Sequence, residues 1–244
     1  MNQPKLEVCV DSAKGMHAAI KGNADRIELC SDLALGGLTP SRALMALATG
    51  SPVPVRVMIR PRSGNFCYAG DEIAQMKADI DLARRAGLSG VVLGASTPDR
   101  QLEPTLLRQL LRHAAPLPAT LHRVVDTLQD PRLAVTTAID LGFDTILTSG
   151  GKNSAYQGLP VIGDMMRLAA GRIDIMPGAG IRVCNAAEIL KATGTNWLHA
   201  SCSRDPEKLN YLSAPNSGTN SSTGTDAGIC QKISDICRNF NPPT

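Results

Sequence analysis

Two short segments of the chain repeat the same pair of reactive residues, a glutamate followed two positions later by a cysteine. Glu7 and Cys9 form the first pair, and Glu28 and Cys30 form the second. Each pair alternates with apolar residues, so a β-strand would direct both members to one face. A buried glutamate has a raised pKa and suits general base catalysis, whereas thiolates are ligands that copper(I) prefers. The repeat therefore supports two chemistries.

Two later segments carry charged side chains suited to binding an anion and to moving a proton. Arg60-Pro-Arg62 forms a semi-rigid clamp that can hold a carboxylate or phosphate with paired hydrogen bonds. In His122-Arg123-Val-Val-Asp126, the histidine suits proton transfer or metal ligation, and Asp126 could orient either His122 or Arg123. A histidine that is simply hydrogen-bonded in the core is the alternative for His122.

Three Gly- and Ser-rich segments follow the last three predicted strands. Such loops, placed before helix N-termini, expose backbone N–H groups to an anion. The predicted anion-binding residues are Arg60, Arg62, Ser149, Gly150, Gly178, Gly180 and Ser201. The candidates for acid–base catalysis are Glu7, Glu28, His122, Asp126 and His199.

An alternation of short strands and helices must position these residues. The predicted strands are Leu6–Val10, Arg26–Cys30, Val55–Arg60, Gly90–Leu93, Ala119–Arg123, Thr145–Thr148, Ile173–Met176 and Trp197–Ala200. Strict alternation with helices predicts a parallel sheet, and eight repeats within about 200 residues fit a closed barrel. The predicted fold class is therefore α/β, a (β/α)8 TIM barrel, with residues 1–244 forming a single domain.

Strand parity predicts which side chains face the barrel axis, because the outer faces lie under helices and must be apolar. The predicted interior positions include Glu7, Cys9, Glu28, Cys30, Arg56, Met58, Arg60, Thr120, His122, His199 and Ser201. An ion pair of Arg56 with Glu7 or Glu28 is the structural alternative to a function for these charges. The residues nearer the carboxyl ends of the strands are the predicted site, since active sites of barrels lie there.

The helices carry start and stop signals. The first is expected to begin with Asp11 or Ser12 as its N-cap and to end before Gly22, and the second to begin with Thr39 as its N-cap. Further helices are predicted at Asp71–Ala86, Pro104–His113, Pro131–Leu141, Leu159–Ala170 and Val183–Lys191. A flexible Ser/Thr/Gly-rich segment at about 213–228 precedes a short C-terminal helix at Ile229–Asn239.

Composition excludes several classes of partner. The net charge is only +3, aromatic residues make up 3%, and no basic run is interleaved with aromatics, so nucleic acid is not an expected partner. No stretch approaches the roughly 18 consecutive apolar residues of a membrane span, and the start lacks the features of a secretory signal. Seven scattered cysteines without a C-x-x-C motif indicate reduced thiols, and a cytoplasmic location is expected.

In chain order, five groups of motifs resemble the CutC family. They are ADRIELC with GGLTPS, MIRPRSGNFCY, LHRVVD, LTSGG and MPGAGI, at residues 24–30, 36–41, 58–68, 121–126, 147–151 and 176–181. The resemblance spans about Leu6–Ser203, and the tail beyond departs from it. It implies a (β/α)8 barrel, a cytoplasmic homodimer or homotetramer, and a role in copper homeostasis. It also implies copper(I) binding through cysteines, with the Cys of ELC corresponding to Cys30.

Two functional hypotheses follow. In the first, Cys9 and Cys30 lie at equivalent points of adjacent strands and bind one copper(I) ion, to which His199, His122 and Met58 could add; Cys30→Ser should then abolish copper binding. In the second, the protein is an enzyme, a lyase, isomerase or hydrolase. It would act on a small phosphorylated or carboxylated substrate at the C-terminal barrel mouth, and Arg60→Ala should abolish anion binding. Whether the protein is an enzyme stays open.

Overall fold

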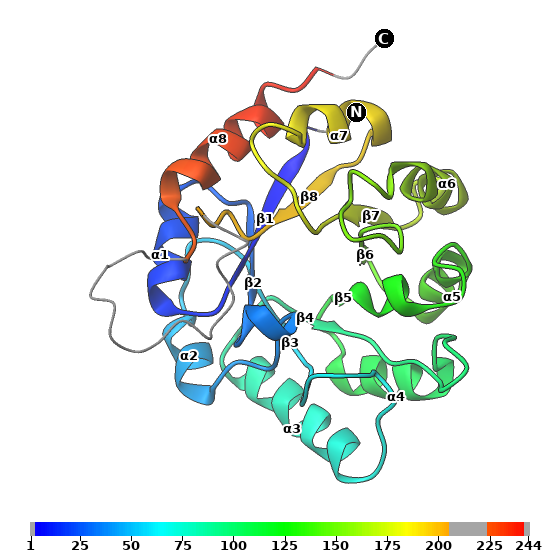
Figure 1. Ribbon diagram of the computed structural model, residues 1–244. Helices are drawn as coiled ribbons and strands as arrows, with labels where there is room; N and C mark the ends of the chain where they lie inside the picture. Colours follow the sequence, from blue (N-terminus) through cyan, green and yellow to red (C-terminus); the bar gives the residue numbers. More distant parts are fainter. Residues whose placement is uncertain (1–2, 205–223, 242–244) are drawn as a thin grey trace, which may run out of the picture.

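Eight parallel strands form the inner layer of the computed structural model, which describes residues 3–204 and 224–241 (Figure 1). They are β1 (Lys5–Val10), β2 (Arg26–Leu29), β3 (Val55–Met58), β4 (Gly90–Leu93), β5 (Ala119–Leu121), β6 (Thr145–Thr148), β7 (Asp174–Pro177) and β8 (Trp197–Ala200). Hydrogen bonds connect them in the order β7-β6-β5-β4-β3-β2-β1-β8. Thr195 Oγ1 donates to the carbonyl oxygen of Ile175 at 2.5 Å and links the two ends of this order. The predicted fold class is confirmed.

Helices surround the strands on the outside. They are α1 (Ala13–Lys21), α2 (Arg42–Leu47), α3 (Asp71–Arg85), α4 (Pro104–Ala114), α5 (Leu133–Leu141), α6 (Leu159–Ala169), α7 (Ala186–Thr193) and α8 (Ala227–Arg238). The 3₁₀ helices of the described ranges, η1 (Leu33–Leu35) and η2 (Arg123–Thr127), follow β2 and β5. Among the described residues, no helix is both long and apolar enough to cross a bilayer.

Local hydrogen bonds decide where the elements begin. Ser12 Oγ accepts from the backbone N–H of Gly15 at 3.1 Å, which confirms it as the N-cap of α1. Thr39 was the wrong N-cap for α2, because its hydroxyl accepts from the N–H of Arg60 at 2.9 Å. Ser41 caps α2 instead, accepting from Leu44 at 3.2 Å. The hydrogen bond between Arg60 and Thr39 joins the loops that follow β2 and β3.

The fifth predicted strand was two residues too long. His122 Nδ1 accepts from the backbone N–H of Val124 at 3.1 Å, so the histidine is the N-cap of η2. The chain therefore leaves the sheet after Leu121, and Arg123 belongs to the helical turn rather than to β5.

Strand parity separates an outer core from the barrel interior. Leu6, Val8, Val10, Ile27 and Leu29 belong to the large cluster between sheet and helices, as predicted. Inside the barrel, Cys30, Met58 and Val92 form a small separate apolar cluster.

Two ion pairs fill the amino-terminal half of the interior. Arg56 donates to Asp144 Oδ1 at 2.7 Å and to Thr120 Oγ1 at 2.6 Å. Its predicted pairing with Glu7 or Glu28 is therefore wrong, because Asp144 directly precedes β6 and presents its carboxylate to the guanidinium. Glu7 pairs with Arg26 instead. Buried charges are stable only when paired in this way.

The C-terminal helix α8 covers the outside of β1 and packs beside α1 and α7. Asp226 Oδ1 accepts from the N–H groups of Gly228 and Ile229 at 2.9 and 3.0 Å, so α8 starts earlier than predicted. Ser203 and Thr225 form an antiparallel bridge. The last residues of the segment predicted to be flexible, 224–228, are therefore structured, whereas 213–223 lie outside the described residues.

Candidate functional site

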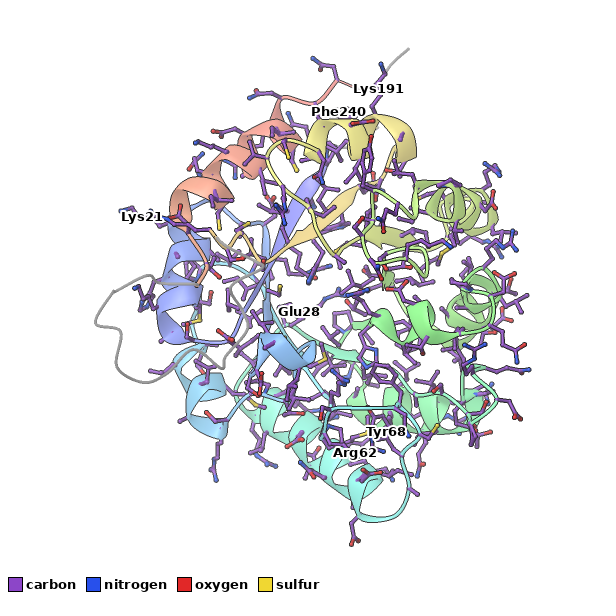
Figure 2. The ribbon with its side chains drawn as sticks, in the orientation of Figure 1. Lys21, Glu28, Arg62, Tyr68, Lys191 and Phe240 are labelled. Carbon is purple, nitrogen blue, oxygen red and sulfur yellow. The ribbon has the colours of Figure 1, made fainter. Side chains whose placement is uncertain are left out.

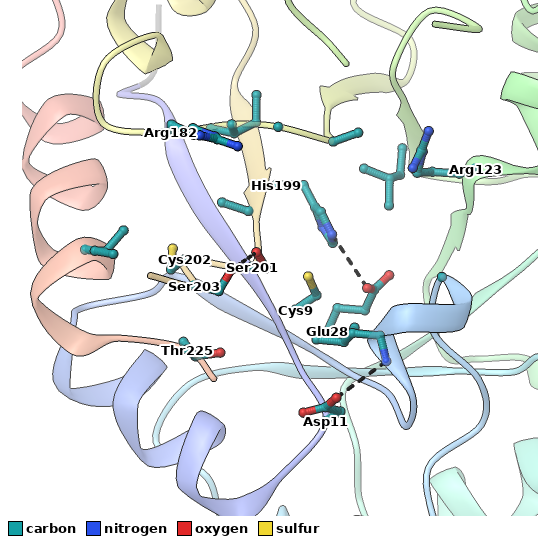
Figure 3. A pocket seen from close by; sticks show the side chains of 18 of the residues that line it. Cys9, Asp11, Glu28, Arg123, Arg182, His199, Ser201, Cys202, Ser203 and Thr225 are labelled. Atoms are coloured by element: carbon teal, nitrogen blue, oxygen red, sulfur yellow. Dashed lines mark hydrogen bonds and ion pairs between the residues drawn. The ribbon is translucent and has the colours of Figure 1, made fainter. Parts of the chain in front are cut away.

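A cavity of about 510 Å³ opens at the carboxyl ends of the strands. Strands β1, β2 and β8 supply its floor, and the loops that follow the strands supply its walls (Figure 3). The lining combines apolar side chains, several sulfur atoms and a few charged groups. It includes Cys9, Glu28, Leu33, Met58, Arg60, Phe66, His122, Leu147, Ile181, Arg182, Cys184, His199, Ser201 and Cys202. The predicted position of the site at this end of the barrel agrees with this cavity.

Three potential metal ligands converge in this cavity. One ligand atom from each of Cys9, Glu28 and His199 lies within 4.8 Å of the other two, and all three residues are buried. The strand register explains the cluster, because Cys9 is the Cα partner of Glu28 in the β1–β2 ladder. His199 Nε2 approaches Glu28 Oε2 to 3.7 Å from β8. Figure 3 shows Cys9, Glu28 and His199 directed toward one another.

Glu7 fixes the orientation of His199 from below. The Glu7 carboxylate lies 2.8 Å from His199 Nδ1 and also pairs with Arg26. Burial alone would raise the pKa of Glu7, but Arg26 and His199 outweigh burial and lower that pKa to about 2. An ionised Glu7 can only accept, so Nδ1 carries a proton and Nε2 faces the cluster. A carboxylate behind a histidine in this way is typical of metal ligands.

Burial and charge act in opposite directions on His199. Burial disfavours the imidazolium, but Cys9, Glu28 and Glu7 outweigh it and raise the pKa of His199 well above its usual value. Burial also raises the pKa of Glu28. A positive charge is therefore stabilised at this point, and a bound cation could replace the His199 proton.

Cys30 lies beside the cluster rather than within it. Its thiol donates to Glu28 Oε2 at 3.4 Å and packs with Met58 and Val92. Burial, followed by the charge of Glu28, raises the pKa of Cys30 well above the usual value. The prediction that Cys9 and Cys30 lie at equivalent points of adjacent strands is wrong. The stagger of a barrel sheet places Glu28, and not Cys30, beside Cys9.

The predicted Arg60-Pro-Arg62 clamp is divided. Arg60 lines the cavity, and its terminal nitrogens donate to the carbonyl oxygens of Leu35 at 2.8 Å and of Gly37 and Gly64 at 3.2 Å. Arg62 instead pairs with Glu72 of α3. Figure 2 shows Glu28 near the barrel axis and Arg62 far from it, beside α3. The two guanidinium groups therefore do not hold one anion together.

Asp126 occupies the backbone amides that were expected to bind an anion after β6. Its carboxylate accepts from the N–H groups of Ser149 and Gly151 at 3.0 Å and from Thr148 Oγ1 at 2.6 Å. It also pairs with Arg123 at 2.8 Å. Asp126 thus orients Arg123, not His122.

Gly150 is satisfied internally as well, because its N–H donates to Thr148 Oγ1 at 2.9 Å. The predicted anion loop after β6, formed by Ser149 and Gly150, is therefore a closed hydrogen-bond network within the protein.

In the loops after β7 and β8, some predicted anion-binding residues are engaged within the protein and others line the cavity. Gly178 donates its N–H to the carbonyl oxygen of Thr148, and a Cβ there would lie 2.5 Å from Leu147 and 3.3 Å from His199. Its small size thus makes room for Leu147 and, less tightly, for His199. Gly180 and Ser201 line the cavity, and Ser201 Oγ lies 3.2 Å from Ser203 Oγ.

Sequence reasoning missed Arg26, although extending the parity of its strand would have directed it inward. It precedes Glu28 by two positions in the same strand and therefore shares the inward face. Its Cζ lies 4.0 Å from the centroid of the Trp197 ring, so Trp197 and Glu7 hold it between them. Cys184 and Cys202 were also missed, since they lie in loops, where no periodicity indicates direction.

Known proteins resemble this chain over the strands and loops of the barrel. The profile described as the CutC family matches residues 4–204. A CutC-family protein of Agrobacterium fabrum is 49% identical over 222 residues, 88% of each chain. The copper homeostasis protein cutC homolog of Homo sapiens is 46% identical over 197 residues, which are 80% of this chain and 72% of the human protein.

Solved structures extend the likeness to three dimensions. A CutC protein from Streptococcus agalactiae has a TM-score of 0.77 and 31% identity, covering 81% of this chain and 98% of that one. Phosphoribosylanthranilate isomerase from Pyrococcus furiosus has a TM-score of 0.60 at 12% identity, covering 97% and 100% of the two chains. At that identity the second likeness shows the barrel fold alone.

Proposed function

Because the chain belongs to the CutC family, we propose that it is a copper homeostasis protein that binds copper(I) at the mouth of its barrel. The observation that carries the proposal is the cluster of Cys9, Glu28 and His199, whose ligand atoms lie within 4.8 Å of one another. The name of the human relative supports copper as the metal.

The donor atoms suit copper(I) in their chemistry. Copper(I) favours soft thiolate and thioether ligands and also accepts imidazole nitrogen. Cys9 Sγ and His199 Nε2 form such a pair, while Glu28 supplies a harder oxygen. Three further sulfur-containing side chains line the same cavity, Met58, Cys184 and Cys202. They support a path along which a soft ion could move from the mouth to the cluster.

Cys30 takes an accessory role in this proposal. Its thiol donates to Glu28 and lies outside the group of Cys9, Glu28 and His199, so it would support the cluster or replace Glu28 when copper binds. The decisive substitution therefore moves from Cys30 to Cys9.

Anaerobic titration of the reduced protein with copper(I) against a competing chelator tests the proposal. Wild type should bind one ion per chain. Cys9→Ser should weaken copper binding at least about 100-fold, because loss of a direct ligand costs more affinity than the roughly 10–100-fold typical of residues that only hydrogen-bond to the ligands. Cys30→Ser should cost no more than about tenfold. Cys67→Ser is the matched control, because Cys67 lies outside the cavity beside Ser96.

Equal copper affinity of wild type and Cys9→Ser would overturn the assignment of the site. A parallel titration with zinc distinguishes the metals, because a thiolate, imidazole and carboxylate set also suits zinc. Tight zinc binding together with weak copper(I) binding would overturn copper as the cargo.

We extend the proposal to location and assembly, as the family resemblance implies. All seven cysteines lie in the described residues and all are free thiols, which supports a reducing compartment such as the cytoplasm. A homodimer or homotetramer is proposed, and sedimentation equilibrium of the full chain measures it directly. A monomer at micromolar concentration would contradict the assembly without affecting the copper site.

A further inference from the structure

Three polar atoms in residues that line the cavity are buried and unpaired. Within the described part of the chain, Glu28 Oε1, Arg60 Nε and His122 Nε2 have no hydrogen-bond partner. Glu28, Arg60 and His122 are only 3%, 6% and 3% exposed. An unpaired buried polar group is destabilising, because it loses its hydrogen bonds to water without replacement. Three such atoms around one cavity therefore indicate a ligand that pairs with them.

The hydrogen bonding of His122 identifies its free atom as a donor. Nδ1 accepts from the backbone N–H of Val124 and therefore carries no proton. Burial, followed by the charge of Arg60, lowers the pKa of His122 to about 3, so the ring is neutral. The single proton of a neutral imidazole then lies on Nε2. His122 thus carries one unpaired N–H in a side chain that lines the cavity.

Arg60 presents a second donor with a permanent positive charge. Its terminal nitrogens already donate to carbonyl oxygens of Leu35, Gly37 and Gly64, which fixes the guanidinium in place. Its Cζ lies 4.8 Å from the centroid of the Phe66 ring, and that ring lies 4.9 Å from His122. Phe66 thus contacts both donor side chains and supplies an apolar surface next to them.

We propose that this cavity binds a small organic monocarboxylate, whose carboxylate accepts from His122 Nε2–H and Arg60 Nε–H. The apolar part of the ligand packs against Phe66 and against Leu33, Met58, Leu147 and Ile181, which line the same space. A volume of about 510 Å³ is typical of a small-molecule pocket. Glu28 Oε1 remains for a hydroxyl or amino group of the ligand.

A carboxylate fits this pair of donors better than a phosphate does. Only two unpaired donors belong to the set, whereas a phosphate has three terminal oxygens to satisfy. The backbone amides of Ser149 and Gly151, which could have held further oxygens, are occupied by Asp126. Glu28 would also repel a dianion. The carboxylate site does not rest on copper binding, since its two donors, Arg60 and His122, lie outside the cluster of Cys9, Glu28 and His199.

Isothermal titration of metal-free protein with acetate, butyrate, hexanoate and 3-phenylpropionate tests the proposal. Affinity should rise along the series as apolar surface is buried. The amide of 3-phenylpropionate should bind at least about tenfold more weakly than the acid, because charge-assisted hydrogen bonds are the stronger ones. Inorganic phosphate should also bind at least about tenfold more weakly, because it has no apolar part to bury and more oxygens than the two donors can pair.

His122→Asn removes the donor from the position of Nε2 while keeping the fold, because the shorter asparagine is a good N-cap and can still accept from Val124. It should weaken binding of 3-phenylpropionate at least about tenfold, the worth of one hydrogen bond to a charged group. His113→Asn is the matched control, because His113 lies on α4 and its ring nitrogen contacts Asp81 at 3.0 Å. This variant should bind 3-phenylpropionate as tightly as wild type does.

Two results would overturn the proposal. The first is a lack of saturable binding across the acid series, which would mean that water satisfies the three buried atoms. The second is equal affinity of wild type and His122→Asn. Copper titration of His122→Asn separates the two proposals, because loss of acid binding with unchanged copper affinity affects only this one.

Discussion

Burial of a neutral histidine makes the stability of this protein depend on pH in a way that one substitution isolates. The pKa of His122 falls from 6.5 to about 3 in the folded chain, because burial and Arg60 disfavour the imidazolium. Between these values the unfolded chain binds a proton that the folded chain does not. Unfolding then takes up a proton, so the free energy of unfolding decreases as the pH falls.

The size of the effect follows from the shift. At pH 5 the medium is about 1.5 units below the unfolded pKa, and each unit corresponds to about 1.36 kcal/mol, which gives about 2 kcal/mol. Glu28 has the opposite sign, because its raised pKa lets the folded state bind the extra proton. The difference between wild type and His122→Asn removes that contribution, since both proteins contain Glu28.

Urea unfolding of metal-free wild type and His122→Asn at pH 7 and pH 5 measures the difference. Wild type should lose about 2 kcal/mol relative to the variant on acidification. A difference that stays constant between the two pH values would refute the neutral, buried state of His122. Ring ¹⁵N shifts of an imidazolium at pH 5 would refute the neutral state as well, and they would also remove the reason for placing the single ring proton on Nε2.

Further substitutions at Glu7, Gly158 and Asp226, with control variants, test the structure around the site. Glu7→Gln leaves Arg26 buried without a carboxylate and should destabilise the protein by about 3–5 kcal/mol; an unchanged urea midpoint would contradict the buried pair. Gly158→Ala would place a Cβ 1.8 Å from the Ser149 carbonyl oxygen and should cost more than about 3 kcal/mol. The control Gly163→Ala in α6 would place a Cβ no closer than 4.0 Å to Arg167, its nearest neighbour. It should leave the free energy of unfolding unchanged or raise it by up to about 1 kcal/mol in urea unfolding. Asp226→Ala removes the cap of α8 and should cost about 1 kcal/mol, whereas Asp226→Asn should keep most of it; equal melting of the two variants would refute the capping role.

Much of the fold could be predicted from local pattern. Alternation in β1 and β2 correctly directed Leu6, Val8 and Ile27 outward, because the pleat fixes the side of each residue regardless of its neighbours. Ser12 and Gly22 bounded α1 as expected, since caps depend on a few adjacent groups. Thr39 was placed wrongly because its hydroxyl bonds to Arg60, a partner 21 positions away.

The candidate site was predicted in composition and only partly in arrangement. Parity identified Cys9, Cys30, Arg60, His122 and His199 as inward residues near the barrel mouth, and all of these except Cys30 line the cavity. Parity does not give the stagger between strands, which decided that Glu28 and not Cys30 lies beside Cys9. Nor does it show whether a donor is already engaged, as the amides of Ser149 and Gly151 are by Asp126.

Element types, inward and outward faces and the family follow from local sequence alone, because they depend on periodicity and on contiguous motifs. The tertiary structure alone decided which inward residues meet. Barrel closure brings β8 beside β1, so that His199 reaches Glu7 across 192 positions of sequence. Register and closure result from packing of the whole sheet against its helices, and no local segment encodes them.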